Sequence, residues 1–170
     1  AGLVDVLRKD NVNIINPLGS AILENIGLAP FMENICHYFL QEDLILPQIA
    51  TWWCGQEKER AFVLENLHRL IVKKIDRTDA VQIYIGKNLS FEERENLHAL
   101  IIQNPYQYAA QEEIRFSTAP HYTNGKIEPR NAVIRAYALK KDDNYTVMNG
   151  GLVRVSATND ALLVSSGKGG

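Results

Sequence analysis

The sequence has 170 residues, of which 46% are hydrophobic and 22% are charged, a composition typical of a folded globular protein. Its net charge of −2 and the lack of a long basic stripe argue against nucleic-acid binding. No apolar run approaches the roughly 20 residues that span a bilayer, and no signal peptide is visible, so we expect no membrane partner and a cytoplasmic location. Because the chain begins at Ala1 and stops in the tail GKGG, we expect a segment of a longer protein.

Three segments are predicted to be helical, near residues 28–40, 57–69 and 90–103. The first has apolar residues at the i, i+3, i+4 and i+7 spacing that places them on one buried face. The last begins with Ser90-Phe91-Glu92-Glu93, the pattern of a capping box. From Leu70 onward, short β-branched and aromatic runs alternate with turn residues. We therefore predict an α+β fold, with a largely antiparallel sheet and flanking helices.

The two cysteines, Cys36 and Cys54, are too few for a disulfide framework. Cys54 follows two tryptophans in a stretch that invites comparison with a redox motif, but no second cysteine follows after two intervening residues. A nucleophilic cysteine needs an oriented base, and the sequence places no histidine beside Cys54. We expect Cys54 to be buried and slow to react, and we keep a thiol hydrolase as an alternative.

Lys73 closes an otherwise apolar strand in the run LIVKK. A lysine at the mouth of a buried strand is placed to meet a phosphate or a ring nitrogen. The same pattern also fits a lysine that simply extends its ammonium group into solvent at a strand end.

The stretch YQYAAQEEIRFSTAP has the character of a buried strand that becomes polar at Gln111 and Glu112 and then breaks into a loop. Such a strand end presents backbone groups that could read an adenine and a carboxylate that could bind sugar hydroxyls. A solvated strand end without any ligand would show the same pattern.

Two arginines follow in the predicted antiparallel strands, after a hairpin turn at Thr123-Asn124-Gly125-Lys126. Arg135 lies in a strand predicted over 131–139, and Arg154 lies in a later one. An arginine inside an apolar strand is costly unless its guanidinium group meets an anion. One such arginine usually has a structural carboxylate partner, but two of them, taken with the lysine and glutamate above, favour phosphate binding.

Six strings of this sequence resemble, in the same order, motifs of the circularly permuted ATP-grasp family, which is related to glutathionylspermidine-synthase-like ligases: NPLGSAILEN, ATWWCG, LIVKK, AAQEEIRFSTAP, EPRNAVIRAYAL and VMNGGLVRV. The resemblance implies an ATP-grasp-like fold, with residues 1–68 in an N-terminal α/β lobe and residues 69–170 in the nucleotide-binding subdomain. It also implies a parent protein that joins a carboxylate to an amine through an acyl phosphate, with ATP and magnesium. The carboxylate and amine substrates are not readable.

The resemblance further implies roles for single residues. Lys73 resembles the strand lysine that contacts the nucleotide, and Gln111 and Glu112 resemble the hinge that reads adenine and ribose. Arg135 and Arg154 resemble the basic residues on the phosphate side, where they would act in catalysis. If these roles hold, the side chains should converge on one cleft.

The sequence departs from the family pattern at Lys74, where the family has proline, and at Asn149-Gly150-Gly151-Leu152, where it has PGGL. The magnesium ligands are expected upstream of residue 1, so we predict no metal site in this segment and an isolated segment that is inactive. An alternative of another class is a degenerate module that binds a nucleotide or a protein partner and performs no chemistry.

Overall fold

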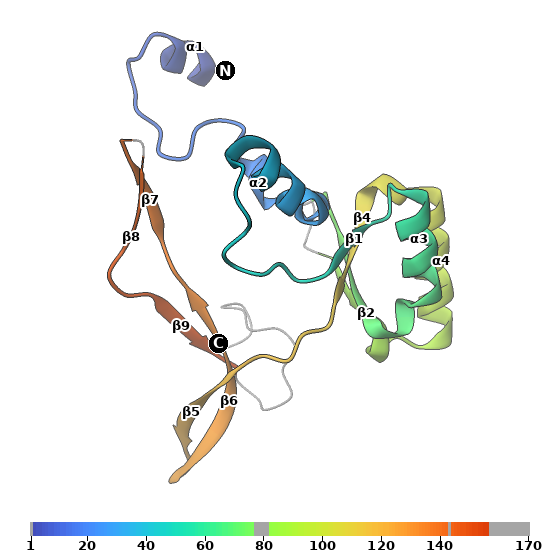
Figure 1. Cartoon of the computed structure of the whole chain (residues 1–170). Helices are drawn as coiled ribbons and strands as arrows, with labels where there is room; N and C mark the ends of the chain where they lie inside the picture. Colours follow the sequence, from blue (N-terminus) through green and yellow to red (C-terminus); the bar gives the residue numbers. More distant parts are fainter. Residues whose placement is uncertain (1, 77–81, 143, 157–170) are drawn as a thin grey trace. The chain divides into compact units, whose positions relative to one another are not determined.

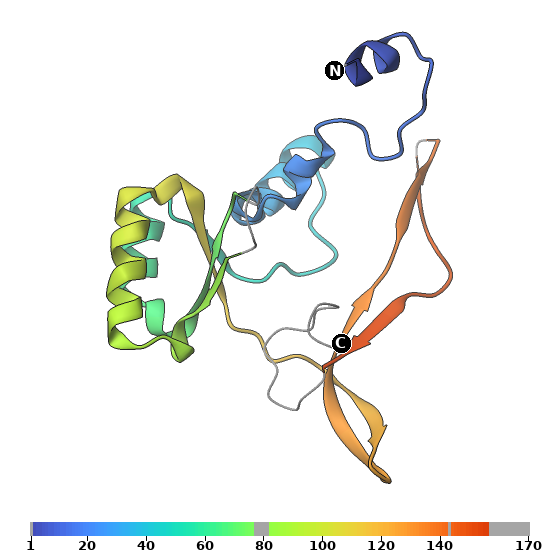
Figure 2. The ribbon, with the colours of Figure 1, turned by 180° about the vertical axis from the view of Figure 1, so that it is seen from behind.

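The computed structural model describes residues 2–76, 82–142 and 144–156 (Figures 1 and 2). The chain forms two compact units, Ala1–Glu113 and Ile114–Gly170, which we describe separately as the first and the second unit. Helices accompany sheets in which every pair of strands is antiparallel, so the predicted α+β fold is confirmed. The boundary predicted after residue 68 separates two subdomains of the family rather than these two compact units, and it stays a prediction.

The first unit is built on a four-stranded sheet with the strand order β1-β4-β2-β3. The strands are β1 (Thr51–Trp53), β2 (Leu70–Lys74), β3 (Ile83–Ile85) and β4 (Tyr108–Glu112). Helices α3 (Glu57–Glu65) and α4 (Phe91–Gln103) lie side by side along the sheet (Figures 1 and 2). One face of the sheet is therefore covered by α3 and α4, and these two helices leave the other face open.

The core lies between these two helices and the sheet. The side chains of Val63, Leu97 and Ile101 come from the helices, and Val72 and Ala110 come from the central strands, all of them essentially inaccessible to solvent. Burial of such side chains contributes about 1.5–3 kcal/mol each for the larger ones. Because side chains alternate along a strand, burial of Leu70 and Val72 sends Ile71 and Lys73 to the opposite face.

Helix α4 begins where the sequence predicts. The Glu93 backbone N–H donates to Ser90 Oγ at 3.3 Å, and the Ser90 N–H donates to the Glu93 carboxylate at 2.8 Å. These two bonds satisfy donors that the first helical turn leaves without a partner. The hydrogen bonds from Ser90 also lower the pKa of the Glu93 carboxyl.

The predicted helix near 28–40 consists of two parts, a 3₁₀ helix η2 (Ile26–Phe31) followed by α2 (Met32–Leu40). Asn25 caps η2, since its Oδ1 accepts the Gly27 N–H at 2.8 Å. Pro30 lies inside η2, where it has no N–H to donate.

The remaining helices are short: α1 (Leu3–Arg8), η1 (Ser20–Glu24), η3 (Leu67–Arg69), η4 (Gly86–Asn88) and η5 (Pro105–Gln107). None of the helices in the described parts of the chain is long and apolar enough to cross a membrane.

The second unit contains a three-stranded sheet, β5-β6-β9, and a separate pair, β7-β8. Asn124 and Gly125 have φ angles of 49° and 78° between β5 and β6, which is the left-handed geometry of the predicted hairpin turn. The strands are β5 (Thr118–Thr123), β6 (Lys126–Arg135), β7 (Ala138–Lys141), β8 (Asn144–Val147) and β9 (Leu152–Val155). The single strand predicted over 131–139 is wrong, because the ladder of β6 with β9 ends at Arg135 and Ala138 begins β7, which pairs with β8 in a separate sheet.

Candidate functional site

Lys73 and Gln111 come together on the face of the first-unit sheet that α3 and α4 leave open. In the register of β2 and β4, Gln111 lies opposite Ile71, and Ala109 lies opposite Lys73. Paired residues share a face, so the lysine and the glutamine are diagonal neighbours. Lys73 Nζ donates to Gln111 Oε1 at 2.6 Å. Two residues that the sequence analysis assigned to the nucleotide are thus in direct contact.

A chain of hydrogen bonds continues from this pair to the edge strand β1. Gln111 Nε2 donates to Thr51 Oγ1 at 3.0 Å, and Thr51 Oγ1 donates to the Ile49 carbonyl at 2.8 Å. Thr51 is the direct cross-strand partner of Gln111. Three adjacent strands therefore each contribute one polar side chain to the same face.

A pocket of about 370 Å³ opens beside the lysine. Its walls come from the strands and from the segment around η2, and its polar lining residues are Glu24, Asn25, Gln48, Lys73, Lys74 and Gln111. The volume lies within the range of small-molecule sites. Lys74 follows Lys73 along β2, so alternation directs its side chain to the other face and only the Lys73 ammonium group is placed to serve this pocket. An ammonium group binds phosphate as a point charge, so the Lys73 side chain makes this pocket the candidate site for an anionic ligand.

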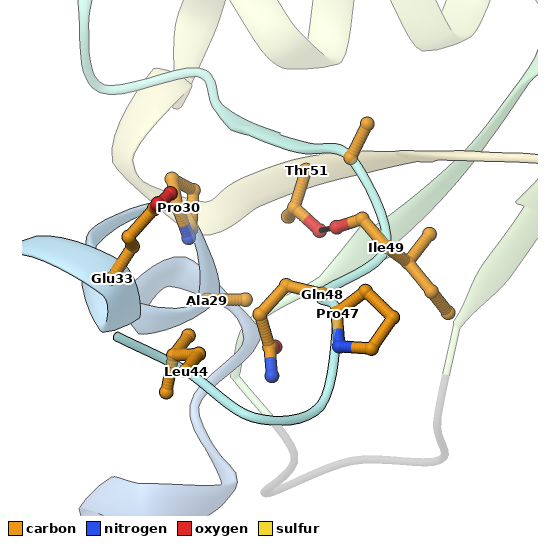
Figure 3. Close-up of a pocket in the computed structure, with 9 residues that line it drawn as sticks. Ala29, Pro30, Glu33, Leu44, Pro47, Gln48, Ile49 and Thr51 are labelled. Atoms are coloured by element: carbon orange, nitrogen blue, oxygen red, sulfur yellow. Dashed lines mark hydrogen bonds between the residues drawn. The ribbon is translucent and has the colours of Figure 1, made fainter. Parts of the chain in front are cut away.

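Two further pockets of the first unit differ from this one in that neither is lined by a lysine or an arginine. A pocket of about 430 Å³ shares Ala29 and Gln48 with the first, and its charged lining residue is Glu33. Figure 3 shows this pocket, with the Thr51 hydroxyl bonded to Ile49 in its wall. A pocket of about 200 Å³ is lined mainly by apolar and aromatic side chains, among them Phe31 and Trp53. We therefore place the candidate site at the pocket that contains Lys73.

Glu112 does not join this group. It is the last residue of β4 and pairs with Leu70, a residue of the helix-covered face. Alternation along the strands therefore places Lys73 and Glu112 on opposite faces of the sheet. The exposed Glu112 is fixed through its backbone, whose N–H donates to the Ala50 carbonyl at 3.0 Å. Its contact with a ribose stays a prediction, and the expected convergence with the lysine is not seen in the sheet.

Arg135 and Arg154 lie on neighbouring strands of the second unit. Arg135 pairs with Leu152, and Arg154 pairs with Val133, so both arginines project from the same face of the β6-β9 ladder. Diagonal neighbours of this kind are about 7–8 Å apart, close enough for both to reach one polyanion.

The premise that these arginines are buried among apolar residues is not met. Arg135 is exposed and Arg154 is only half-buried, and the side chain of Ile134 next to Arg135 is 72% exposed. Val153, beside Arg154, is 51% exposed. The strands are apolar in sequence, but they form a thin sheet whose faces stay accessible within the second unit. The desolvation cost therefore gives no reason to infer an anion, and the roles of both arginines stay predictions.

Cys54 is fully buried, as predicted. Burial raises the pKa of its thiol to about 12, and the charge of Arg60 opposes this shift only in part. The nucleophile of a thiol enzyme is the thiolate, which would be almost absent here near neutral pH. Burial and a raised thiol pKa both argue against the thiol hydrolase.

We expect a thiol reagent at pH 7 to modify Cys54 at least about 100-fold more slowly in the folded chain than in urea, because the sulfur becomes accessible only when the core opens. The measurement is alkylation followed by mass spectrometry in a Cys36→Ala background, since Cys36 is partly accessible. Equal rates in buffer and in urea would contradict the burial described above.

No group of three or more histidine, cysteine, aspartate or glutamate side chains among residues 2–76, 82–142 and 144–156 could hold a metal ion. We therefore derive no step through a magnesium ion.

A sequence model described as "Circularly permuted ATP-grasp type 2" matches residues 1–156. The chain belongs to this family. The resemblance found in the sequence is thus confirmed, and the mixed helix and antiparallel sheet architecture agrees with an ATP-grasp-like fold. ATP-grasp proteins generally bind ATP with magnesium.

Relatives of this ATP-grasp chain include three uncharacterized proteins. The chain is 30% identical over 169 residues to one from Synechocystis sp., covering 99% of this chain and 35% of that protein. It is 28% identical over 170 residues to one from Mycobacterium leprae, covering 100% of this chain and 30% of the relative. It is 31% identical over 160 residues to one from Mycobacterium bovis, covering 94% of this chain and 18% of the relative. The chain therefore spans about a third or less of these relatives.

The sequence analysis missed Thr51 and Gln48, which line the pockets of this ATP-grasp segment. Thr51 precedes two tryptophans in one of the family-like strings, ATWWCG, and a polar residue at the start of an aromatic strand was a usable signal. Gln48 lies before β1 in a stretch with no periodic pattern, so no sequence signal pointed to it.

Proposed function

We propose that this chain carries nucleotide-binding elements of an ATP-dependent carboxylate–amine ligase. The observation that supports the proposal most is the pocket at Lys73, whose ammonium group is bonded to Gln111, within a member of the ATP-grasp family. In the parent protein, a carboxylate oxygen would attack the terminal phosphorus of ATP, releasing ADP and forming an acyl phosphate. An amine would then attack the acyl carbon, and phosphate would leave.

The residues of this chain would bind and orient the nucleotide. Lys73 would donate hydrogen bonds to phosphate oxygens, and Gln111 would keep the lysine in place. Arg135 and Arg154 would stabilise the negative charge that develops on the transferred phosphoryl group, as fixed cations do in phosphoryl transfer. Glu112 lies on the other face of the sheet from Lys73 but at the end of β4, so it would accept hydrogen bonds from ribose hydroxyls only of a nucleotide that extends around this strand end. Magnesium ligands would lie upstream of residue 1 in the longer protein, so residues 1–170 alone would bind ATP without turning it over.

A titration that compares ATP with adenosine tests this proposal. The titration is followed through backbone NMR signals. We expect a dissociation constant for ATP on the order of 0.1–1 mM, or about 4–5.5 kcal/mol of binding free energy. Arg135→Ala and Arg154→Ala should each weaken ATP about tenfold and adenosine less than twofold, because a charge-assisted contact contributes about 1.5–3 kcal/mol. Glu112→Ala should weaken both ligands alike.

Lys140→Ala is the matched control, since Lys140 is an exposed cation on another strand of the second unit. Each variant must first give the NMR spectrum of a folded chain. The proposal fails if the wild-type spectrum does not change at several millimolar ATP, or if removing Lys140 costs as much ATP affinity as removing either arginine.

A further inference from the structure

We propose that Thr51 is a positioning residue that acts through Gln111 to hold the Lys73 ammonium group in place for a phosphate. Thr51 is two hydrogen bonds away from Lys73, and nothing in the family resemblance assigns it a role. The inference deepens the proposed function and rests on it for the identity of the ligand.

The series of hydrogen bonds from Lys73 to Ile49 has one possible direction, because the group at each end of the series fixes which atom of Gln111 must face it. Thr51 has one hydroxyl proton, which it donates to the Ile49 carbonyl at 2.8 Å, so its oxygen can only accept from Gln111. At the other end, the Lys73 ammonium group has three donors and no acceptor, so it requires the amide oxygen of Gln111. Both ends therefore demand the same orientation of the Gln111 amide.

A rotated Gln111 amide would be penalised at both ends. Its NH₂ group would then face the ammonium group at 2.6 Å, donor against donor, and its oxygen would face a threonine oxygen whose proton is directed elsewhere. Without the threonine hydroxyl, only the lysine end would favour the observed orientation.

The pairing across the sheet makes this arrangement rigid. Thr51 and Gln111 are direct partners on β1 and β4, and Ile71 lies opposite Gln111 on β2. The side chains thus start from backbone positions that the ladder holds in place. Lys73 has a flexible four-carbon stem, and a side chain already held in its binding conformation loses less freedom when a ligand arrives. Loss of the Thr51 hydroxyl should therefore weaken the binding of a phosphate, although Thr51 itself does not contact the ligand.

The decisive comparison is between Thr51→Val, which keeps the shape but removes the hydroxyl, and Thr51→Ser, which keeps the hydroxyl. We expect Thr51→Val to raise the dissociation constant of ATP threefold to tenfold and that of adenosine less than twofold. Thr51→Ser should stay within twofold of the wild-type protein for both ligands. Thermal unfolding confirms that the variants are folded.

A second readout does not depend on ATP. The ¹³Cε relaxation of Lys73, measured without ligand, should show a more mobile ammonium end in Thr51→Val and in Gln111→Leu, but not in Thr51→Ser. Failure of the wild-type protein to bind ATP would overturn the proposed function alone, and the relaxation data would still decide the positioning role. If valine and serine at position 51 give the same Lys73 mobility, the inference is wrong.

Discussion

Gly86→Ala is expected to lower the free energy of unfolding of the first unit by at least about 3 kcal/mol, a large part of the 5–15 kcal/mol that stabilises a typical domain. A Cβ atom at Gly86 would lie 1.6 Å from the Leu67 carbonyl oxygen and 2.8 Å from the Leu70 carbonyl oxygen. Both contacts are with backbone, so no side chain can rotate to relieve them. The backbone that enters β2 would have to move, and with it the buried Leu67 and Leu70.

The matched control is Gly27→Ala, where the added Cβ would lie 3.0 Å from the ends of the Asn25 and Ile75 side chains. The end of the Ile75 side chain can move aside, and Asn25 Oδ1 needs to shift only slightly, at some cost to its hydrogen bond with the Gly27 N–H. Alanine also restricts the unfolded chain, so we expect a change of less than about 1 kcal/mol. Urea unfolding followed by tryptophan fluorescence reports on the first unit alone, because both tryptophans, Trp52 and Trp53, lie in β1. Equal urea midpoints for the Gly86 variant and the wild-type protein would contradict the clash.

The sequence was sufficient where a structural feature depends on local chemistry. The capping box at Ser90 and the Asn-Gly turn before β6 are each encoded within four residues, and both are found as predicted. Strand β4 becomes accessible at Gln111, where the sequence becomes polar, because alternation and burial act along a single strand.

Features that depend on register between distant segments were not predictable. The hydrogen bond between Gln111 and Thr51 joins residues 60 positions apart, and no local pattern fixes which residue of β1 faces the glutamine. The same limit applies to Glu112, since only the observed pairing with Leu70 shows that it alternates to the other face from Lys73.

Apolar composition was also a poor guide to burial in the second unit. Arg135 has apolar neighbours along the chain, yet Ile134 beside it is largely exposed. Burial requires a second layer against the strand, and a sequence pattern cannot show whether one is present. The case for phosphate binding by the arginines therefore rests on the family resemblance and on their shared face, and no longer on the cost of burying them.

Lys73→Met is expected to have the largest effect on ligand binding of any substitution in the first unit. The variant keeps an unbranched side chain of similar length but removes the ammonium group that lines the pocket beside Gln111. A hydrogen bond to a charged group contributes about 1.5–3 kcal/mol, which corresponds to a loss of ATP affinity of about 10- to 100-fold. The pocket is open to solvent, so we expect a value nearer tenfold. Adenosine has no phosphate and should lose less than twofold.

The same change of charge elsewhere provides the control for this prediction. Lys58 is an exposed lysine of α3, on the other side of the sheet from the pocket, and Lys58→Met should leave both affinities within twofold. Calorimetric or NMR titration of ATP, AMP and adenosine against the two variants gives the result directly. If both variants lose ATP affinity equally, the effect is that of net charge and Lys73 is not a phosphate ligand. If Lys73→Met weakens ATP and adenosine by the same factor, the lysine supports the nucleoside end, and the phosphates must be bound by other cations of the chain.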